Sequence, residues 1–370
     1  MKTGLITFHS SYNCGSMLQT FALQTVLEKL GHQTTVLDFS NDGQRALYSV
    51  FSKSCDLKSI VKNCIMLLCK NRVEKNFASY EDFKNKYFHL SSRKYLKACE
   101  LTDDGFETIV TGSDQVWNIT IEDGDDAYFL PWVTKARKIA YSPSFGARNI
   151  LEHSQYPEKY AGYLKSFHSL SIRENNGKKW IKDLTGLDVP VLIDPTLILS
   201  REDYDQIAST RLQLPKKYIF YYSPGYSRDI NKLVSNISEK YNLPVIAFNT
   251  KTFYNKGMFL SKMTLPDLEN PSTYLQLIKN ATMVITTSFH GSIFSSVYNK
   301  CFWVVKNGNM FITDDRVPTL VRSLDLEDRV VNINFDNEFD YLQQKDYSKY
   351  YELLAEERTK ALNYIKQSFA

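Results

Sequence analysis

A chain of 370 residues is too long for one ordinary hydrophobic core, and its length predicts two domains of roughly 150 to 200 residues each. Hydrophobic residues make up 43% of the chain and charged residues 23%, which excludes a disordered or fibrous protein. The 45 basic and 41 acidic residues are spread along the chain, so the net charge of +4 predicts no nucleic-acid-binding surface.

The six cysteines show neither CxxC spacing nor the density of a disulfide scaffold, so we expect reduced thiols and no metal site. No segment reaches the run of about 18 apolar residues that a membrane-spanning helix requires. The first residues, MKTGLITFHSS, also lack the pattern of a secretion signal. The sequence therefore predicts a cytoplasmic protein.

The first half of the chain alternates short apolar runs with amphipathic segments. Residues 4–8 predict a buried strand, residues 17–31 a helix, and residues 33–39 a second strand. Similar strands are predicted at residues 107–112, 138–145, 169–174 and 189–194. This alternation predicts a first domain over residues 1–205, built on a parallel, doubly wound sheet.

Residues 42–100 do not follow this alternation and predict a helical insertion. A short part of it contains six basic residues and only two acidic ones. The basic residues are Lys53, Lys58, Lys62, Lys70, Arg72 and Lys75, and the acidic residues are Asp56 and Glu74. An amphipathic basic helix can lie on an anionic membrane surface, although packing with a solvated charged face is more common. Peripheral contact with the inner membrane surface is therefore one expectation for this insertion.

A polar stretch at residues 200–217 is predicted to connect the first domain to a second α/β domain over residues 206–345. Further strands are predicted at residues 218–224, 243–249, 281–287, 300–306 and 328–333. Residues 346–370 predict a long amphipathic helix that packs back on the first domain. The predicted fold class is thus α/β, with two facing Rossmann-like domains.

Ligands of doubly wound proteins bind at the carboxyl ends of the strands, so the loops after the strands are the candidate sites. Asn13 and Gly15 follow the first strand, before a helix N-terminus, although such residues also occur in turns for conformational reasons alone. Asp114 and Trp117 follow the strand at 107–112, where a carboxylate and an indole suit a sugar. A helix cap and a core side chain fit these two residues equally well.

Two more loops contain an arginine and a histidine. Arg173 follows a predicted strand, where its guanidinium can bind a phosphate or carboxylate with two hydrogen bonds, or can form an ion pair with Glu174. His290 lies between a predicted strand and a predicted helix, where a group suited to proton transfer stands beside amides that attract anions.

Six segments together resemble the polysaccharide pyruvyl transferase family, in order from about residue 3 to residue 331. They are FHSSYNCGSMLQTFALQTVLEKLGH, VTGSDQVWN, SFGA, SIRE, VLIDPTLIL and ITTSFHGSIFSSVYNKCFWVV. The resemblance implies a GT-B-like fold and transfer of the enolpyruvyl group of phosphoenolpyruvate to a hydroxyl pair of a sugar residue in a surface-polysaccharide precursor. A pyruvate ketal would form and phosphate would leave. Phosphoenolpyruvate would be a co-substrate, without a cofactor, and the acceptor a lipid-linked oligosaccharide.

The resemblance also implies roles for single residues. Arg173 matches the arginine of the family's S-V-R-E/D motif, a ligand of the anionic donor, and His290 matches the histidine of its [RS]-x-H-G motif, a general acid or base. Ser288, Gly291 and Ser292 would complete the donor site.

This chain departs from the family pattern at Ser288, where many members have an arginine. Either part of the donor's negative charge is met by another group or the donor is held differently, and Lys306 and Arg316, shortly downstream, are the candidate substitutes. The candidate acceptor-binding residues are Asn13, Gly15, Asp114 and Trp117.

Two other functions fit the same architecture. A GT-B glycosyltransferase that uses a nucleotide sugar would also bind an anion at a helix terminus of the second domain, but we find no acidic pair clearly suited to the donor's ribose and sugar. A non-catalytic carbohydrate-binding relative is suggested by the missing arginine at position 288. Phosphate release, nucleotide release and acceptor binding without turnover distinguish the three functions.

Overall fold

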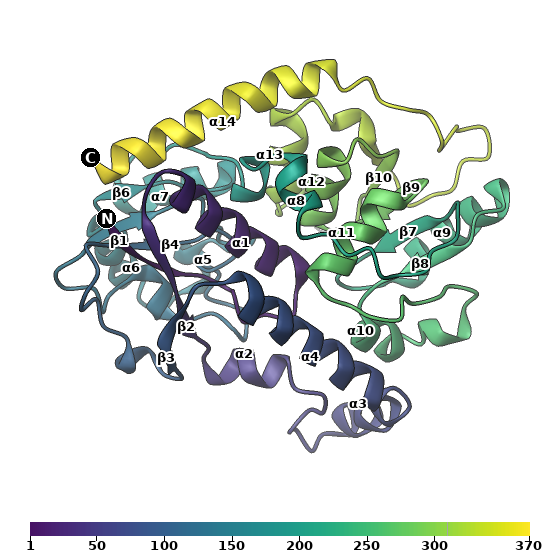
Figure 1. The fold of residues 1–370 in the computed structure, drawn as a ribbon, viewed down its shortest axis with the longest axis horizontal. Coiled ribbons are helices and arrows are strands. Elements are labelled where there is room, and N and C mark those ends of the chain that lie inside the picture. The colour runs from purple at the N-terminus through teal and green to yellow at the C-terminus, as the bar shows by residue number, and fades with distance from the viewer. Residues whose placement is uncertain (309) are drawn as a thin grey trace.

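Short apolar runs rich in β-branched and aromatic residues form two parallel sheets in the computed structural model, which describes residues 1–308 and 310–370 (Figure 1). The first sheet has the strand order β3-β2-β1-β4-β5-β6 and the second the order β11-β10-β9-β7-β8. The strands are β1 (Lys2–Ile6), β2 (Gln33–Phe39), β3 (Leu90–Tyr95), β4 (Thr108–Thr111), β5 (Arg137–Ala140), β6 (Ser169–Leu170), β7 (Ile219–Tyr222), β8 (Val245–Ala247), β9 (Met283–Thr286), β10 (Phe302–Val305) and β11 (Val330–Val331).

Helices connect these strands, as parallel pairing requires. They are α1 (Cys14–Lys29), α2 (Asp42–Leu47), α3 (Leu57–Leu67), α4 (Lys70–Tyr87), α5 (Ile150–His153), α6 (Pro157–Lys165), α7 (Asn175–Thr185), α8 (Arg201–Asp205), α9 (Arg228–Tyr241), α10 (Thr250–Asn255), α11 (Pro271–Asn280), α12 (Phe289–Val297), α13 (Arg316–Ser323) and α14 (Ser348–Phe369). The predicted fold class, an α/β protein with two facing Rossmann-like halves, is confirmed.

Two sequence predictions differ from the structure. The predicted helical insertion is helical only as far as Tyr87, because Leu90–Tyr95 form β3, the edge strand of the first sheet. An edge strand is half exposed, so its sequence LSSRKY lacks an apolar run. Residues 189–194 form no strand, and Val191 makes only an isolated bridge with Ile172.

A continuous apolar core joins the two halves. Leu5 of β1 and Met17 of α1 belong to the same cluster of buried side chains as Phe220 of β7 and Ile293 of α12. Because burying this apolar surface stabilises the closed arrangement, the loops at the carboxyl ends of both sheets are held facing one another.

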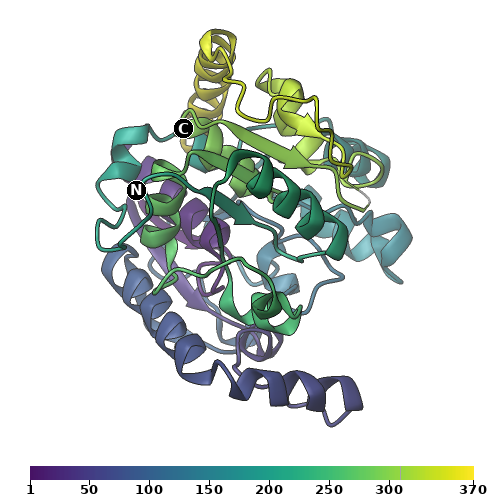
Figure 2. The same ribbon diagram turned by 90° about the vertical axis from the view of Figure 1, so that its right-hand side faces the viewer.

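Helix α14 crosses from the second half to the first, as predicted (Figures 1 and 2). The Tyr350 hydroxyl donates to Ser296 Oγ of α12 at 3.1 Å, whereas the Tyr364 hydroxyl donates to the Ala140 carbonyl of β5 at 2.8 Å. The helix therefore ties the two halves together on the side shown at the top of both figures. Within the described residues, no helix is both long and apolar enough to cross a membrane.

Candidate active site

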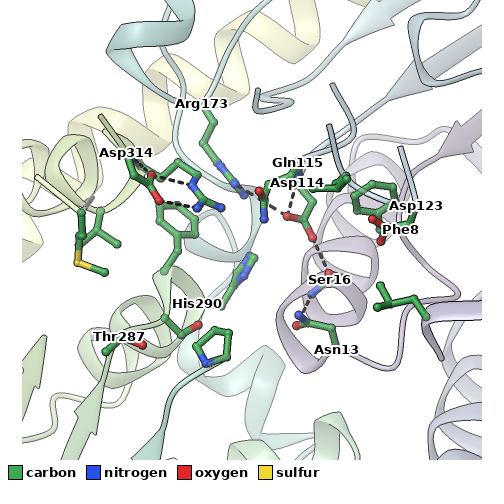
Figure 3. A pocket seen from close by; sticks show the side chains of 18 of the residues that line it. Phe8, Asn13, Ser16, Asp114, Gln115, Asp123, Arg173, Thr287, His290 and Asp314 are labelled. Atoms are coloured by element: carbon green, nitrogen blue, oxygen red, sulfur yellow. Dashed lines mark hydrogen bonds and ion pairs between the residues drawn. The ribbon is translucent and has the colours of Figure 1, made fainter. Parts of the chain in front are cut away.

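A cavity of about 500 Å³ lies between the two halves, where strands of both sheets end. The loops after β1, β4 and β6 line it on one side, and the loops after β7, β9 and β10 line it on the other. Parallel strands bring their carboxyl ends to one edge, so this position follows from the topology. Figure 3 shows the side chains that converge there.

His290 lies in the first turn of α12, at the cavity wall. The helix begins there because the Ser288 side chain caps it, its Oγ accepting a hydrogen bond from the Gly291 amide at 3.2 Å. His290 Nε2 is buried and lies 3.4 Å from Asp194 Oδ2, without an aligned hydrogen bond to any described residue. Nδ1 also makes no hydrogen bond with the described residues, and it lies on the side of the ring that faces α1.

Gly15 makes room for this histidine. A Cβ atom at residue 15 would lie 2.2 Å from His290 Nδ1, so only glycine lets α1 approach the ring this closely. Gly15 was predicted to bind the acceptor, and the structure instead shows that it packs against the candidate acid.

Asp194 is the residue that connects His290 to Arg173, and sequence reasoning did not select it. Its Oδ2 accepts a hydrogen bond from Arg173 Nη1 at 2.9 Å, and its Oδ1 accepts one from Thr196 Oγ1 at 2.7 Å. Burial alone would raise the pKa of this carboxyl, but His290, Arg173 and Thr196 together hold it well below its ordinary value. Asp194 therefore stays ionised beside the histidine.

Arg173 is held as a buried cation. Only 2% of its side chain is exposed, and its guanidinium lies 4.3 Å from the centre of the Phe289 ring and 3.9 Å from Asp114 Oδ1. Together with the Asp194 hydrogen bond, these contacts fix its orientation at the cavity wall.

Glu174, the alternative partner that the sequence offered, has other contacts. Its Oε1 accepts hydrogen bonds from Ser144 Oγ at 3.0 Å and from the Phe145 amide at 2.8 Å. Burial raises the pKa of this carboxyl, although Arg173 opposes the rise. The ion pair of Arg173 is therefore made with Asp194, and Glu174 organises the neighbouring loop.

Asp114 and Asn13 line the cavity from the first half, as Figure 3 shows. Asp114 Oδ2 accepts a hydrogen bond from Ser16 Oγ at 2.6 Å, so this carboxylate is turned toward the start of α1 and caps no following helix. Asn13 caps α1, its Oδ1 accepting from the Gly15 amide at 2.9 Å.

Trp117 does not reach the cavity, which contradicts its predicted contact with a sugar. Its side chain is fully buried, stacks on Phe129 with 5.3 Å between ring centres, and donates from Nε1 to the Tyr128 carbonyl at 3.1 Å. The indole is part of the core beneath the first sheet's loops.

Asp123 faces the cavity and was also missed from the sequence. It lies in the run IEDGDD, whose composition is typical of a solvated loop, yet only 7% of the residue is exposed. Burial raises the pKa of this carboxyl to about 6, and the negative charge of Asp114 adds to the rise. Its neighbour Glu122 also lines the cavity but is exposed.

The family model for polysaccharide pyruvyl transferase matches residues 13–309. The chain belongs to the polysaccharide pyruvyl transferase family. This membership indicates a transferase that acts on polysaccharides. A search of curated protein sequences finds no significant match.

Solved structures support the GT-B-like fold of this family member. Staphylococcus aureus MnaA, solved with UDP, is 12% identical with a TM-score of 0.53, over 100% of this chain and 97% of that chain. A candidate UDP-N-acetylglucosamine 2-epimerase of Listeria monocytogenes is 10% identical with a TM-score of 0.52, over 100% of this chain and 96% of that chain. At such identity the likeness concerns the fold alone.

Among the predicted substitutes for the family's arginine at position 288, this pyruvyl transferase family member brings Arg316 to the cavity and not Lys306. Arg316 opens α13, with its Nε 2.8 Å from Asp314 Oδ1, and 20% of its side chain is exposed. Lys306 is exposed outside the cavity, with its ammonium 5.6 Å from the centre of the Phe311 ring.

Gly291 and Ser292, also predicted for the donor site, use their amides inside α12. The Gly291 amide donates to Ser288 Oγ, and the Ser292 amide donates to the Ser288 carbonyl at 3.0 Å. A Cβ atom at residue 291 would lie 2.3 Å from Thr286 Oγ1, so this glycine is required by close packing. Neither amide is available to an anion. In the part of the chain that the structure describes, no three His, Cys, Asp or Glu residues are grouped to hold a metal ion.

Proposed function

We propose that this transferase moves the enolpyruvyl group of phosphoenolpyruvate onto a hydroxyl pair of a sugar residue, forming a pyruvate ketal and releasing phosphate. The observation that carries the proposal is the polarity of the cavity. Arg316 and Arg173, each paired with a carboxylate, form a cationic wall with the His290 imidazole beside them, and Asp114, Glu122 and Asp123 form an acidic wall. Asp314, which holds Arg316, lies across the cavity from Asp123 in Figure 3.

The cationic wall suits a donor that has both a phosphate and a carboxylate. Arg316 is the more exposed of the two arginines, and a guanidinium can hold either group with two parallel hydrogen bonds. The N-terminus of α12 adds the positive end of a helix dipole beside it. In this proposal Arg316 takes the place of the arginine that other family members have at position 288.

The acidic wall suits an acceptor that has only hydroxyl groups. Carboxylates accept hydrogen bonds from sugar hydroxyls, and they repel an anionic donor toward the opposite wall. A pKa near 6 allows Asp123 to take up a proton close to neutral pH, which is what a general base must do. Asp114 and Asn13 would orient the sugar beside it.

The reaction would begin with proton transfer from His290 Nδ1 to the methylene carbon of phosphoenolpyruvate, which makes the adjacent carbon an oxocarbenium-like electrophile. Asp194, ionised and 3.4 Å from Nε2, stabilises the protonated imidazole that supplies this proton. The first sugar hydroxyl attacks the electrophilic carbon and gives its proton to Asp123. The second hydroxyl then attacks the same carbon, the bond to phosphate breaks, and the second proton returns to His290.

The test combines two measurements on the purified protein. It is incubated with phosphoenolpyruvate and a panel of free and lipid-linked oligosaccharides, and released phosphate is measured while mass spectrometry follows the acceptors. We expect phosphate release together with an acceptor heavier by pyruvate minus one water, and at least about a hundredfold slower release with His290→Ala. Release of nucleotide from nucleotide sugars, with a glycosylated acceptor, would instead establish a glycosyltransferase. Acceptor binding without turnover by any donor would establish a non-catalytic relative.

A further inference from the structure

Helix α3 presents its apolar side chains to solvent and not to the protein. Leu57, Ile60, Val61, Cys64, Leu67 and Leu68 recur at helical spacing and form one face, here called the exposed stripe. The residue exposures are 77% for Leu57, 49% for Ile60, 52% for Val61, 65% for Leu67 and 70% for Leu68. No other described segment covers this face, whereas most amphipathic helices bury theirs against a core.

The opposite side of α3 is firmly attached. Met66 is buried in a small cluster with Cys69 and Val73, and Asn63 exchanges two hydrogen bonds with the backbone of Ser52 at 2.8 and 3.0 Å. The Asp56 side chain caps the helix by accepting from the Ser59 amide at 3.0 Å. The exposed stripe is therefore displayed by an anchored helix, which Figures 1 and 2 show at the lower edge of the molecule.

The charges beside the stripe are mainly positive. Lys53, Lys58 and Lys62 are exposed and form no ion pair within residues 1–308 and 310–370, although Lys62 lies one turn before Met66, on the attached side of α3 near Lys251. Lys70 is 3.7 Å from Glu74, a separation typical of a weak surface pair. Arg72, which the sequence grouped with these cations, instead donates from Nη2 to the Pro266 carbonyl and ties α4 to the second half.

We propose that the exposed stripe, with Lys53 and Lys58 beside it and Lys62 adding charge from the other side of the helix, binds the surface of an anionic lipid bilayer. A helix with an apolar face flanked by lysines lies in the headgroup region, where its apolar side chains enter the acyl boundary and its ammonium groups meet lipid phosphates. Charge complementarity selects this occupant over a second copy of the chain, because two such stripes in contact would bring their lysines together. A helix of 11 residues, about 16 Å long, is also short for the roughly 800 Å² per partner of a stable dimer.

The insertion connects this surface to the cavity. Leu47 and Tyr48, just before α3 in the chain, line the cavity, and Lys251 of α10 donates to the carbonyls of Leu47 and Ser49 at 2.9 and 2.7 Å. A bilayer held at the stripe would lie near the insertion's side of the cavity. This binding is independent of the proposed reaction, although it would bring a lipid-linked acceptor within reach.

The experiment measures co-sedimentation of the full chain with phosphatidylcholine vesicles, with and without about one third phosphatidylglycerol, at low salt and at about 0.5 M salt. We expect binding to the anionic vesicles at low salt, at least about tenfold weaker binding to the neutral ones, and loss of most binding at high salt. Failure of the wild-type protein to bind anionic vesicles at low salt overturns the proposal.

Three variants define the surface. Lys53→Glu with Lys58→Glu and Lys62→Glu should weaken binding to anionic vesicles about a hundredfold, and Leu57→Ser with Val61→Ser should weaken it about tenfold. The control exchanges three exposed lysines of other regions, Lys179, Lys182 and Lys216, for Glu. If the control loses as much binding, only net charge matters and the proposed surface is wrong.

Two more readouts separate the alternatives. A serine variant that converts a dimer to a monomer in analytical ultracentrifugation would identify the stripe as an interface between copies and overturn the membrane proposal. Phosphate release with a soluble acceptor should be equal in all three variants, because none of the substituted residues lines the cavity. Absence of phosphate release from every protein, with vesicle binding intact, would count against the proposed reaction alone.

Discussion

Two arginine–carboxylate ion pairs lie at the cavity, and they differ in how far water reaches their side chains. Arg173 and Asp194 have side chains that are 2% and 0% exposed, whereas those of Arg316 and Asp314 are each 20% exposed. Charges in a poorly hydrated interior interact strongly and cannot exchange partners with water, whereas water reaches a partly exposed pair and screens part of its attraction. The buried pair therefore fixes a charged carboxylate beside His290, and in the proposed function the partly exposed pair leaves its arginine open to an anionic ligand.

Breaking the buried pair should have the largest effect. Arg173→Met leaves Asp194 charged without its strongest hydrogen-bond donor, and we expect a loss of about 3–5 kcal/mol in the free energy of unfolding. Arg316→Met is the matched control, and it should cost no more than about 1 kcal/mol. Urea denaturation of both variants measures the difference. Equal costs would mean that the exposure of the two pairs has no bearing on stability.

Removal of the histidine that the buried pair positions should come next. His290→Ala should reduce turnover of phosphoenolpyruvate and acceptor by about a hundredfold or more while the fold is retained, because positioned proton transfer contributes that much. His153→Ala, at an exposed histidine far from the cavity lining, serves as the control. Turnover is compared after circular dichroism has established equal folding. A rate near that of the wild type would remove His290 from the mechanism.

The exposed pair should affect donor binding more than stability. Arg316→Lys keeps the charge but loses the guanidinium, which can bind an anion with two parallel hydrogen bonds. We therefore expect the KM for phosphoenolpyruvate to rise about tenfold with the unfolding midpoint unchanged. Arg173→Lys should weaken donor use as well, but with a measurable loss of stability. Steady-state kinetics on both variants separates the effects. An unchanged donor KM in Arg316→Lys would assign the donor's anionic groups to another residue.

The smallest expected effect concerns the acidic wall. The pKa of Asp123 is raised from 3.8 to about 6 in the folded chain, so the folded state holds its proton more tightly than the unfolded state does. The stabilising contribution of this group is complete below pH 4 and is lost as the pH rises through about 6.

Asp123→Asn removes this titration. At pH 7 we expect the variant to be more stable than the wild type by about 1 kcal/mol, since cavity water screens part of the charge. The difference should shrink toward pH 4, and thermal unfolding across that range measures it. A difference that stays constant with pH would show that the raised pKa is not present in the protein.

Most strands and the two halves could be predicted from the sequence, because apolar runs and helical spacing are local properties, whereas β3 and residues 189–194 were misassigned. The place of His290 at the cavity could also be predicted, since the end of one strand and the start of one helix determine it. Asp194 was missed because its partners, Arg173 and His290, are 21 and 96 residues away along the chain, and only the fold brings them together.

Residues that are close together in the sequence also take different places in the folded chain. Trp117 and Asp114 are three residues apart in one loop, yet one side chain enters the core and the other lines the cavity. Lys306 and Arg316 both follow β10, but only Arg316 begins the helix that turns back to the cavity. A side chain's direction within a loop depends on packing that no local pattern encodes.

Gly15 belongs to the first half and His290 to the second, so their contact determines how closely the two halves can approach at this point. Any larger side chain at position 15 would overlap the ring of His290, which leaves it no room. In the proposed function, the general acid is thus positioned by the half of the molecule that would hold the acceptor, through the one residue type that has no side chain. A bulkier residue at position 15 would therefore have to displace the imidazole of His290 or force the two halves apart.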